Sequence, residues 1–100
     1  MGRRIVDLHP EAIADGREAR EWYQARSPQA AELFRRELEY AIGRIREAPE
    51  AWPRYLHGTR RYVLRVFPYS VIYTIAGENS LVVAIAHSKR RADYWKTRVK

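Results

Sequence analysis

The chain has 100 residues, of which 46% are hydrophobic, and its formal net charge is +7. This length and apolar content suit one domain over residues 1–100 and exclude a second independent core. The sequence lacks cysteine, which excludes disulfides and thiolate chemistry, and lacks the roughly 20-residue apolar run of a membrane span, so we expect a soluble cytoplasmic protein.

The first quarter of the sequence predicts a strand and then a helix. Residues 4–8 form a short, partly apolar alternating run, which is typical of a strand. Pro10 suits the first turn of a helix, where its missing N–H costs nothing. Apolar residues then recur at helical spacing as far as about Arg26, which predicts an amphipathic helix.

A second helix is predicted directly after the first. Ser27 can cap the free N–H groups of a helix start, and Pro28 fits the first helical position. An apolar stripe from Phe34 to Ile45 steps by three and four residues until Pro49 ends the pattern. We expect the two helices to form an antiparallel hairpin.

The second half of the sequence changes to the pattern of strands. Residues 49–58 contain two prolines and a glycine and predict a loop. Residues 59–67 alternate, which predicts a strand with one partly basic face. Its two faces carry Tyr62, Leu64 and Val66 on one side and Arg61, Val63, Arg65 and Phe67 on the other. Residues 70–76 and 81–87 predict two more strands joined by a turn at 77–79, and the last one is apolar enough to be central.

This order of elements predicts an α+β fold, βααβββ. An N-terminal strand precedes a helical hairpin, and a three-stranded antiparallel meander follows. Because helices and sheets each bury one apolar face, we expect the hairpin to pack on one face of the sheet.

Positive charge is concentrated in the later part of the chain. Residues 1–53 carry nine basic and ten acidic side chains, whereas residues 54–100 carry ten and two. Clustered charge of one sign attracts polyanions or acidic protein surfaces and speeds encounter with them. The alternative is that the charge only keeps the protein soluble.

Basic and aromatic residues around the last strands are the candidate binding residues. Arginine forks onto phosphate or carboxylate groups, and neighbouring aromatic rings stack on bases. The alternative is a solvated basic rim, with the aromatic side chains serving as packing residues. The candidate binding set is Arg61, Arg65, His87, Lys89, Arg90, Arg91, Tyr94 and Trp95.

No metal or cofactor site is expected. The three histidines, His9, His57 and His87, are far apart in the sequence, and a metal site would need all of them to converge. The sequence also lacks a glycine-rich phosphate loop. His87 ends the predicted central strand, where it serves either the fold or the function.

Three segments carry a family resemblance that spans nearly the whole chain. They are Tyr62-Val-Leu-Arg65, Phe67-Pro-Tyr-Ser-Val-Ile-Tyr73 and Ala86-His-Ser-Lys-Arg-Arg-Ala-Asp-Tyr-Trp95. In order and spacing they resemble the RelE/ParE superfamily of toxins, and the last segment is most similar to the ParE-type or plasmid-stabilisation branch. The resemblance implies the same fold that the periodicity predicts.

The superfamily resemblance implies one of two activities. RelE-like members cleave mRNA in the ribosome with basic residues and a tail tyrosine, whereas ParE-like members bind DNA gyrase without nuclease chemistry. The catalytic residues are unknown; for a ribonuclease the matching positions are Arg65, Arg90, Arg91 and Tyr94. Ser70 and Val63 replace two cations of the nuclease pattern, and a phosphoryl-transfer site should lose much of its transition-state stabilisation without them.

We therefore favour a ParE-like toxin over an mRNA interferase or another basic binding module. The resemblance implies a cognate antitoxin, acidic where it binds the toxin, as one partner. DNA gyrase is the expected target, with the ribosome and mRNA as the alternative.

Overall fold

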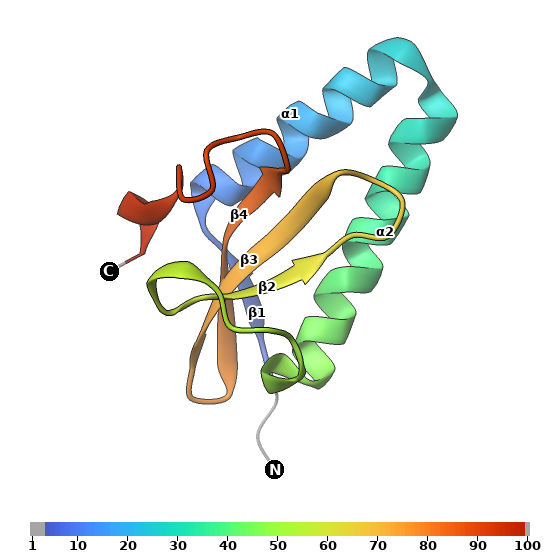
Figure 1. The fold of residues 1–100 in the computed structure, drawn as a ribbon. Helices are drawn as coiled ribbons and strands as arrows, with labels where there is room; N and C mark the ends of the chain where they lie inside the picture. Colours follow the sequence, from blue (N-terminus) through green and yellow to red (C-terminus); the bar gives the residue numbers. More distant parts are fainter. Residues whose placement is uncertain (1–3, 100) are drawn as a thin grey trace.

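The computed structural model describes residues 4–99 and contains one mixed sheet with a helical hairpin (Figure 1). The sheet order is β1-β4-β3-β2, in which β1 is parallel to β4 and the other neighbours are antiparallel. The elements in chain order are β1 (Val6–Leu8), α1 (Pro10–Arg26), α2 (Pro28–Glu47), β2 (Arg60–Val63), β3 (Tyr69–Ala76) and β4 (Asn79–His87). The predicted α+β class and βααβββ order are confirmed.

The helix boundaries follow the capping chemistry of the sequence. The backbone N–H of Glu11 donates to Nδ1 of His9 over 3.0 Å, and Pro10 opens α1. The Ser27 hydroxyl accepts from the N–H of Ala30 over 3.2 Å, so one residue ends α1 and caps α2. Cap residues of this kind satisfy N–H groups that have no partner within the helix.

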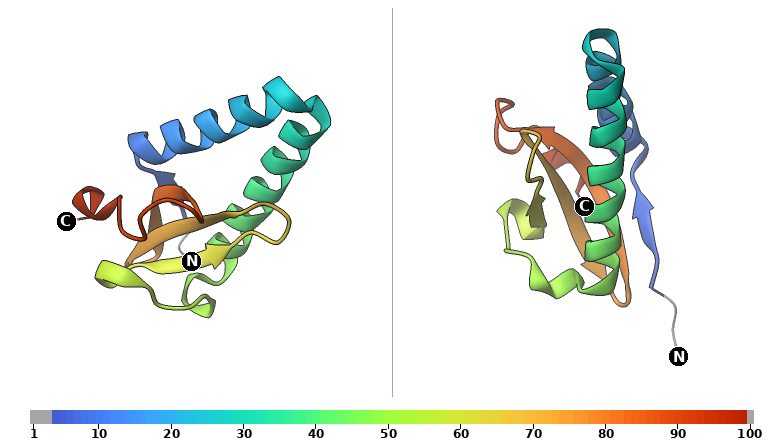
Figure 2. Two further views of the ribbon diagram at one scale, coloured as in Figure 1. Left: turned by 45° about the horizontal axis from the view of Figure 1, so that its top comes forward. Right: turned by 90° about the vertical axis from the view of Figure 1, so that its right-hand side faces the viewer.

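The helices cover one face of the β2–β4 meander (Figure 2). Small residues of α1 and larger ones of α2 pack on the sheet, which keeps α1 close to β4. The buried members of this helix-side core are Ala12, Ala19, Phe34, Ala41, Ile45, Tyr62, Leu64, Val71, Tyr73, Val82 and Ile85. Tyr73 is buried with its hydroxyl donating to the carbonyl of Pro49 over 2.6 Å, so the core contains a satisfied polar group.

The chain after β4 covers the opposite face of the sheet. Trp95 is fully buried there against Ile72 and two consecutive residues of β4, Val83 and Ala84. The two consecutive β4 residues reach the same side because the pairing of β3 with β4 shifts by one residue there: Ile72 pairs with Ala84, and Tyr73 pairs with Val82. Val82 and Ile85 of β4 are buried in the helix-side core, so β4 is covered on both faces, as predicted for the central strand.

The predicted strand over residues 59–67 was too long. It ends at Val63, and Val66, which was predicted to share a face with Tyr62 and Leu64, is 76% exposed, whereas Phe67 packs against the helix-side core. The carboxylate of Glu37 on α2 accepts the backbone N–H groups of Arg65 and Val66, which removes them from the strand ladder. No helix within residues 4–99 has the length and apolar character needed to cross a membrane.

Candidate functional site

On the face of the sheet opposite the helices, called the tail side because the chain after β4 covers it, a small cationic hollow has a volume of about 150 Å³. Arg61 enters from β2, and Arg90 and Arg91 enter from the turn after β4. The Arg61 guanidinium lies 4.2 Å from the ring centre of Tyr55, and that of Arg90 lies 3.7 Å from the ring centre of Tyr94. Stacking on a ring face holds each guanidinium while leaving its N–H groups free to bind a partner.

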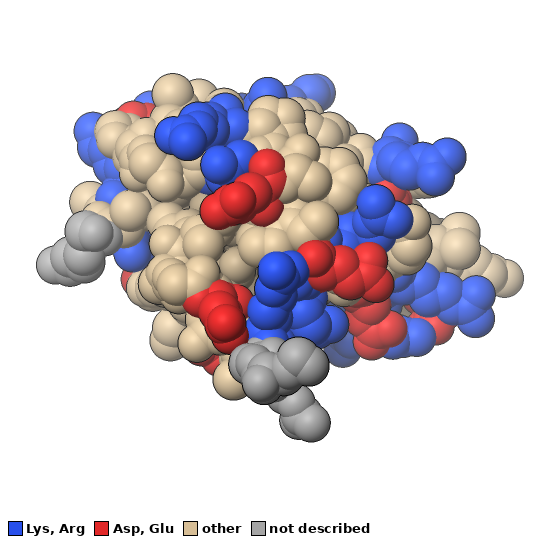
Figure 3. Space-filling view, turned by 90° about the horizontal axis from the view of Figure 1, so that it is seen from below, with Lys and Arg blue, Asp and Glu red and all other residues tan. Residues whose placement is uncertain are grey.

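Few carboxylates neutralise these cations. Within residues 4–99, neither Arg61 nor Arg90 forms an ion pair, and Arg91 has only a 3.7 Å contact with Asp93. The face of the molecule that is seen from below differs, because basic and acidic side chains intermix on it (Figure 3). The hollow is therefore a source of unbalanced positive potential, which favours a negatively charged partner.

The structure separates Arg65 from the other predicted cations. Arg65 follows the end of β2, where its backbone is held by Glu37 on the helix side, and it does not line the hollow. The expectation that Arg61 and Arg65 share one strand face was wrong, because the strand ends between them. Lys89 also lies outside the hollow, in the exposed turn where its N–H donates to Nδ1 of His87 over 3.0 Å.

A polar clasp that the sequence analysis missed holds the tail against the sheet edge. One oxygen of Asp15 on α1 accepts from the Ile85 N–H over 3.1 Å, the Tyr94 hydroxyl over 3.1 Å and Arg98 over 2.7 Å. Arg98 also donates to the carbonyl of Val83 over 2.9 Å. The Asp15 and Arg98 side chains thus bind backbone groups of β4 beyond the residues that pair with β1. They take the place of the hydrogen bonds that a further strand would make.

The contacts with Asp15 also affect the pKa of the Tyr94 hydroxyl. Burial, the Asp15 charge and the hydrogen bond to Asp15 raise the pKa of Tyr94 to about 12. Its hydroxyl is already committed to Asp15, and its ring lies beneath Arg90. This arrangement suits a support for Arg90 better than a proton donor or acceptor at a phosphate.

Trp95 supports the surface rather than forming part of it. Its side chain is fully buried, and it packs 6.1 Å from Tyr55 and 5.9 Å from His57, measured between ring centres. Nε2 of His57 lies 3.0 Å from a carboxylate oxygen of Asp93, and this hydrogen bond lowers the pKa of Asp93. The loop before β2 and the tail are thus joined beside the hollow.

The histidines do not converge. His9 caps α1, His57 contacts Asp93, and His87 lines the hollow at the end of β4. Among residues 4–99, no three His, Asp or Glu side chains gather as a metal site would require. Of the predicted binding set, the structure brings together Arg61, His87, Arg90 and Arg91, with Tyr94 and Trp95 beneath them.

Comparison with solved structures supports the fold. The chain is similar to a structure described as the chromosomal ParDE TA system from P. aeruginosa, with a TM-score of 0.76 and 15% sequence identity. The alignment covers 87% of this chain and 98% of the other, so the whole arrangement of elements is shared. Among curated proteins, none matches this sequence.

The sequence also matches a family model. That model is described as the ParE toxin of the type II toxin-antitoxin system parDE, and it matches residues 6–92. The match includes both helices, the four strands and the turn that carries Arg90. The resemblance predicted from the sequence is confirmed, and the chain belongs to the ParE family of type II toxins.

Proposed function

We propose that this toxin inhibits growth by binding DNA gyrase through the cationic hollow and that a cognate antitoxin neutralises it. The observation that carries the proposal is the pair of stacked arginines, Arg61 and Arg90, which form no ion pair within residues 4–99. Arginines that are held on aromatic rings and lose their water when a partner binds are frequent energetic centres of protein interfaces. An acidic surface of the target would complement them.

The chemistry of the hollow favours binding over RNA cleavage. Ser70 lines it where the nuclease pattern has a cation, and Val63 on β2 is an exposed apolar side chain. The Tyr94 hydroxyl, the expected tail catalyst, is held by Asp15 with a pKa of about 12. Loss of cations and of an available hydroxyl removes the groups that would stabilise a phosphoryl-transfer transition state.

A separate groove between the two helices suits the antitoxin. It has a volume of about 310 Å³ and an apolar floor that includes Phe34, Leu38 and Ile85. Arg17 and Arg20 stand at its rim and form no ion pair within residues 4–99. An apolar segment with acidic flanks would therefore complement this groove in both shape and charge.

Two assays with the purified chain separate the candidate activities. The first measures supercoiling of relaxed plasmid by gyrase, and the second measures ribosome-dependent cleavage of mRNA. We expect inhibition of supercoiling and intact mRNA. Cleaved mRNA together with unaffected supercoiling would contradict the proposal and favour the ribonuclease alternative.

A pair of variants tests whether the cationic hollow is the working surface. We expect the triple variant R61A/R90A/R91A to lose growth inhibition, because it removes the three arginines that line the hollow. Arg65→Ala is the matched control, since it removes an exposed arginine that lies elsewhere. Thermal unfolding of each variant verifies the fold, and full toxicity of a folded triple variant would reject the surface.

A further inference from the structure

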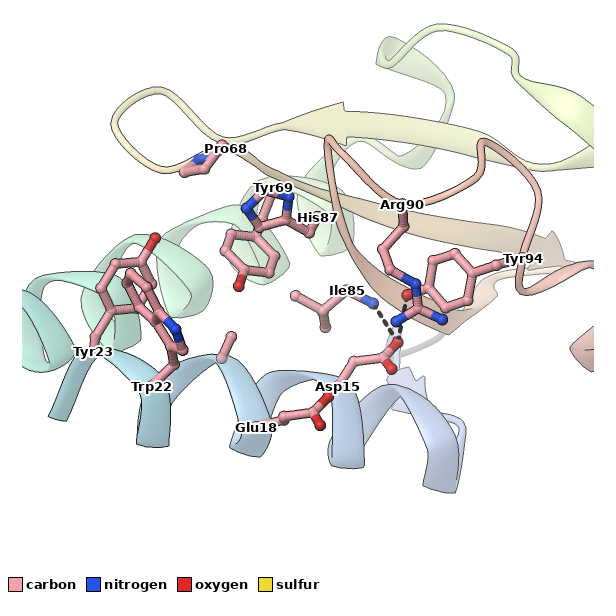
Figure 4. A pocket seen from close by; sticks show the side chains of 11 residues that line it. Asp15, Glu18, Trp22, Tyr23, Pro68, Tyr69, Ile85, His87, Arg90 and Tyr94 are labelled. Carbon is pink, nitrogen blue, oxygen red and sulfur yellow. Dashed lines mark hydrogen bonds between the residues drawn. The ribbon is translucent and has the colours of Figure 1, made fainter. Parts of the chain in front are cut away.

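A second and larger hollow lies beside the cationic one (Figure 4). Its volume is about 480 Å³, and it is bounded by α1, the start of β3 and the turn after β4. Ala19 and Ile85 line it with apolar surface, and His87 and Arg90 line both hollows. This volume falls within the range of small-molecule sites.

Aromatic side chains form much of the wall of the larger hollow. Trp22 is 52% exposed although it is a large apolar residue, and its ring lies 5.1 Å from that of Tyr23. The Tyr69 ring lies 6.4 Å from Tyr23 and 4.9 Å from His87, with near edge-to-face geometry in both pairs. Tyr23 and Tyr69 are partly buried, and Arg26 lies 3.8 Å from the ring centre of Trp22, so each ring is held in place by its neighbours. Held rings beside an apolar hollow suit a planar heterocycle, because stacking on aromatic side chains stabilises nucleic-acid bases of every type.

Two hydrogen-bond donors stand where the larger hollow meets the cationic one. Arg90 is held on the Tyr94 ring and forms no ion pair within residues 4–99. His87 accepts the Lys89 N–H at Nδ1, which leaves Nε2 to carry a proton and to donate it to a ligand. A guanidinium and an imidazole N–H together suit an oxyanion such as a phosphate.

The Glu18 carboxylate also lines the larger hollow, and no cation within residues 4–99 forms an ion pair with it. The other acidic residue of the wall, Asp15, is committed to Arg98, Tyr94 and Ile85. Glu18 lines the same wall as Tyr69, and its charge contributes to the raised pKa of Tyr69 after burial and Tyr23. A carboxylate accepts hydrogen bonds, so it favours a base that carries an amino group and disfavours an anion at this end.

We infer that the larger hollow binds a nucleotide whose base bears an amino group. The base lies among Trp22, Tyr23 and Tyr69 with its amino group toward Glu18, and the phosphate lies against Arg90 and His87. Glu18, which lies on α1 between Asp15 and Trp22, disfavours the phosphate, whereas Arg90 favours it, so these two charges orient the ligand. This site goes beyond the proposed function, which needs only contact with proteins.

The test is a titration of the purified 15N-labelled chain with adenosine monophosphate, followed by NMR at the Trp22 indole. We expect saturable shifts at Trp22 and at the His87 ring. Adenosine lacks the phosphate and ribose 5-phosphate lacks the base, so each should bind about tenfold or more weakly. Uridine monophosphate should bind more weakly than adenosine monophosphate, because uracil has no amino group for Glu18. A single-stranded adenine oligonucleotide is the second arm: tighter binding identifies nucleic acid as the source of the nucleotide, and weaker binding identifies the free form.

Matched variants assign the two halves of the site. Arg90→Ala should weaken binding by about tenfold, whereas Lys96→Ala, which removes an exposed cation of the same tail, should not. Trp22→Ala should abolish the preference for adenosine monophosphate over ribose 5-phosphate, and Tyr40→Ala, an exposed aromatic on α2, should preserve it.

Absence of saturable shifts, or equal losses in Arg90→Ala and Lys96→Ala, would overturn the nucleotide site. These measurements use neither gyrase nor growth. A failed titration with retained inhibition of supercoiling therefore rejects this inference alone, and the reverse result rejects only the proposed function.

Discussion

The two faces of the sheet are stabilised in different ways. Within residues 4–99, the helix-side core contains 11 buried residues and continues across both helices, whereas the tail-side core contains four, of which Trp95 is the largest. The tail side adds polar contacts, namely the Asp15 clasp and the His57–Asp93 hydrogen bond. One face thus gains its stability from apolar area and the other from one large ring and directed hydrogen bonds.

This difference matches what each face carries. The cations of the proposed working surface lie on the tail side, where Arg61 belongs to β2 but Arg90 and Arg91 belong to the segment after β4, which is held at a few points. Segments with few buried apolar contacts open at lower free energy than the core of a domain. We therefore expect helix-side changes to unfold the protein and tail-side changes to displace the surface while the rest stays folded.

The largest expected effect is that of Phe34→Ala on the helix side. The Phe34 ring is buried and lies 5.3 Å from Phe67 and 5.2 Å from Tyr69. Its removal should lower the free energy of unfolding by about 3–5 kcal/mol, a large part of the total for a small domain. Denaturant unfolding followed by circular dichroism measures this loss, and a change below about 1 kcal/mol would contradict the role given to this core.

Trp95→Ala should have the next largest effect, of a different kind. We expect the free energy of unfolding to fall by about 3 kcal/mol, near the lower end of the same range, because the tail can detach without unfolding the helix-side core. Amide hydrogen exchange should rise over residues 91–99 more than in β3. Trp22→Ala is the control, since Trp22 is half exposed. Uniform loss of protection throughout the sheet would show that the two faces unfold together.

Asp15→Asn should weaken the clasp without removing apolar area. The side chains of Asp15 and Arg98 are 11% and 10% exposed, so we expect a loss of about 2 kcal/mol, below that of a fully buried pair. The pKa of Tyr94 should fall from about 12, because the Asp15 charge that helps to raise it is gone, whereas its burial remains and the amide oxygen of asparagine can still accept from the hydroxyl. NMR titration of labelled tyrosine measures the pKa change. An unchanged Tyr94 pKa would show that Asp15 does not raise the pKa of this tyrosine.

The raised pKa of Tyr94 also makes stability depend on alkaline pH. Its folded pKa lies above the ordinary tyrosine value of 10.0, so its contribution is complete below pH 10 and is lost as pH rises through about 12. The Asp15→Asn variant should lose less stability over this window than the parent chain.

The smallest expected effect is that of His57→Asn at the exposed end of the tail side. Asparagine tolerates the left-handed backbone of this position, where φ is 57°, but is too short to keep the contact with Asp93. The pKa of Asp93 should rise toward its ordinary value. Because the hydrogen bond depresses that pKa, its contribution to stability is present at neutral pH and is lost as pH falls through the carboxyl range. An unchanged Asp93 titration by NMR would show that His57 does not hold the tail.

Local signals in the sequence determined much of this fold. Pro10, Ser27 and Pro28 fixed the helix boundaries, because capping depends on residues within one turn of the helix end. Residues 70–76 and 81–87 were correctly predicted as strands from their β-branched, aromatic and apolar composition, because such side chains favour strands. The cations at 89–91 were recognisable as candidates from composition alone.

Only the tertiary structure decided which of those candidates meet. Asp15 and Arg98 are separated by 83 positions, and Glu37 and Arg65 by 28, so neither contact leaves a periodic trace in the sequence. The Glu37 carboxylate ended β2 early and turned Arg65 away from Arg61, while the Asp15 clasp brought the tail and Arg90 to the sheet edge. Periodicity reports which side of its own element a residue faces, whereas the composition of a surface depends on packing between elements distant in the chain.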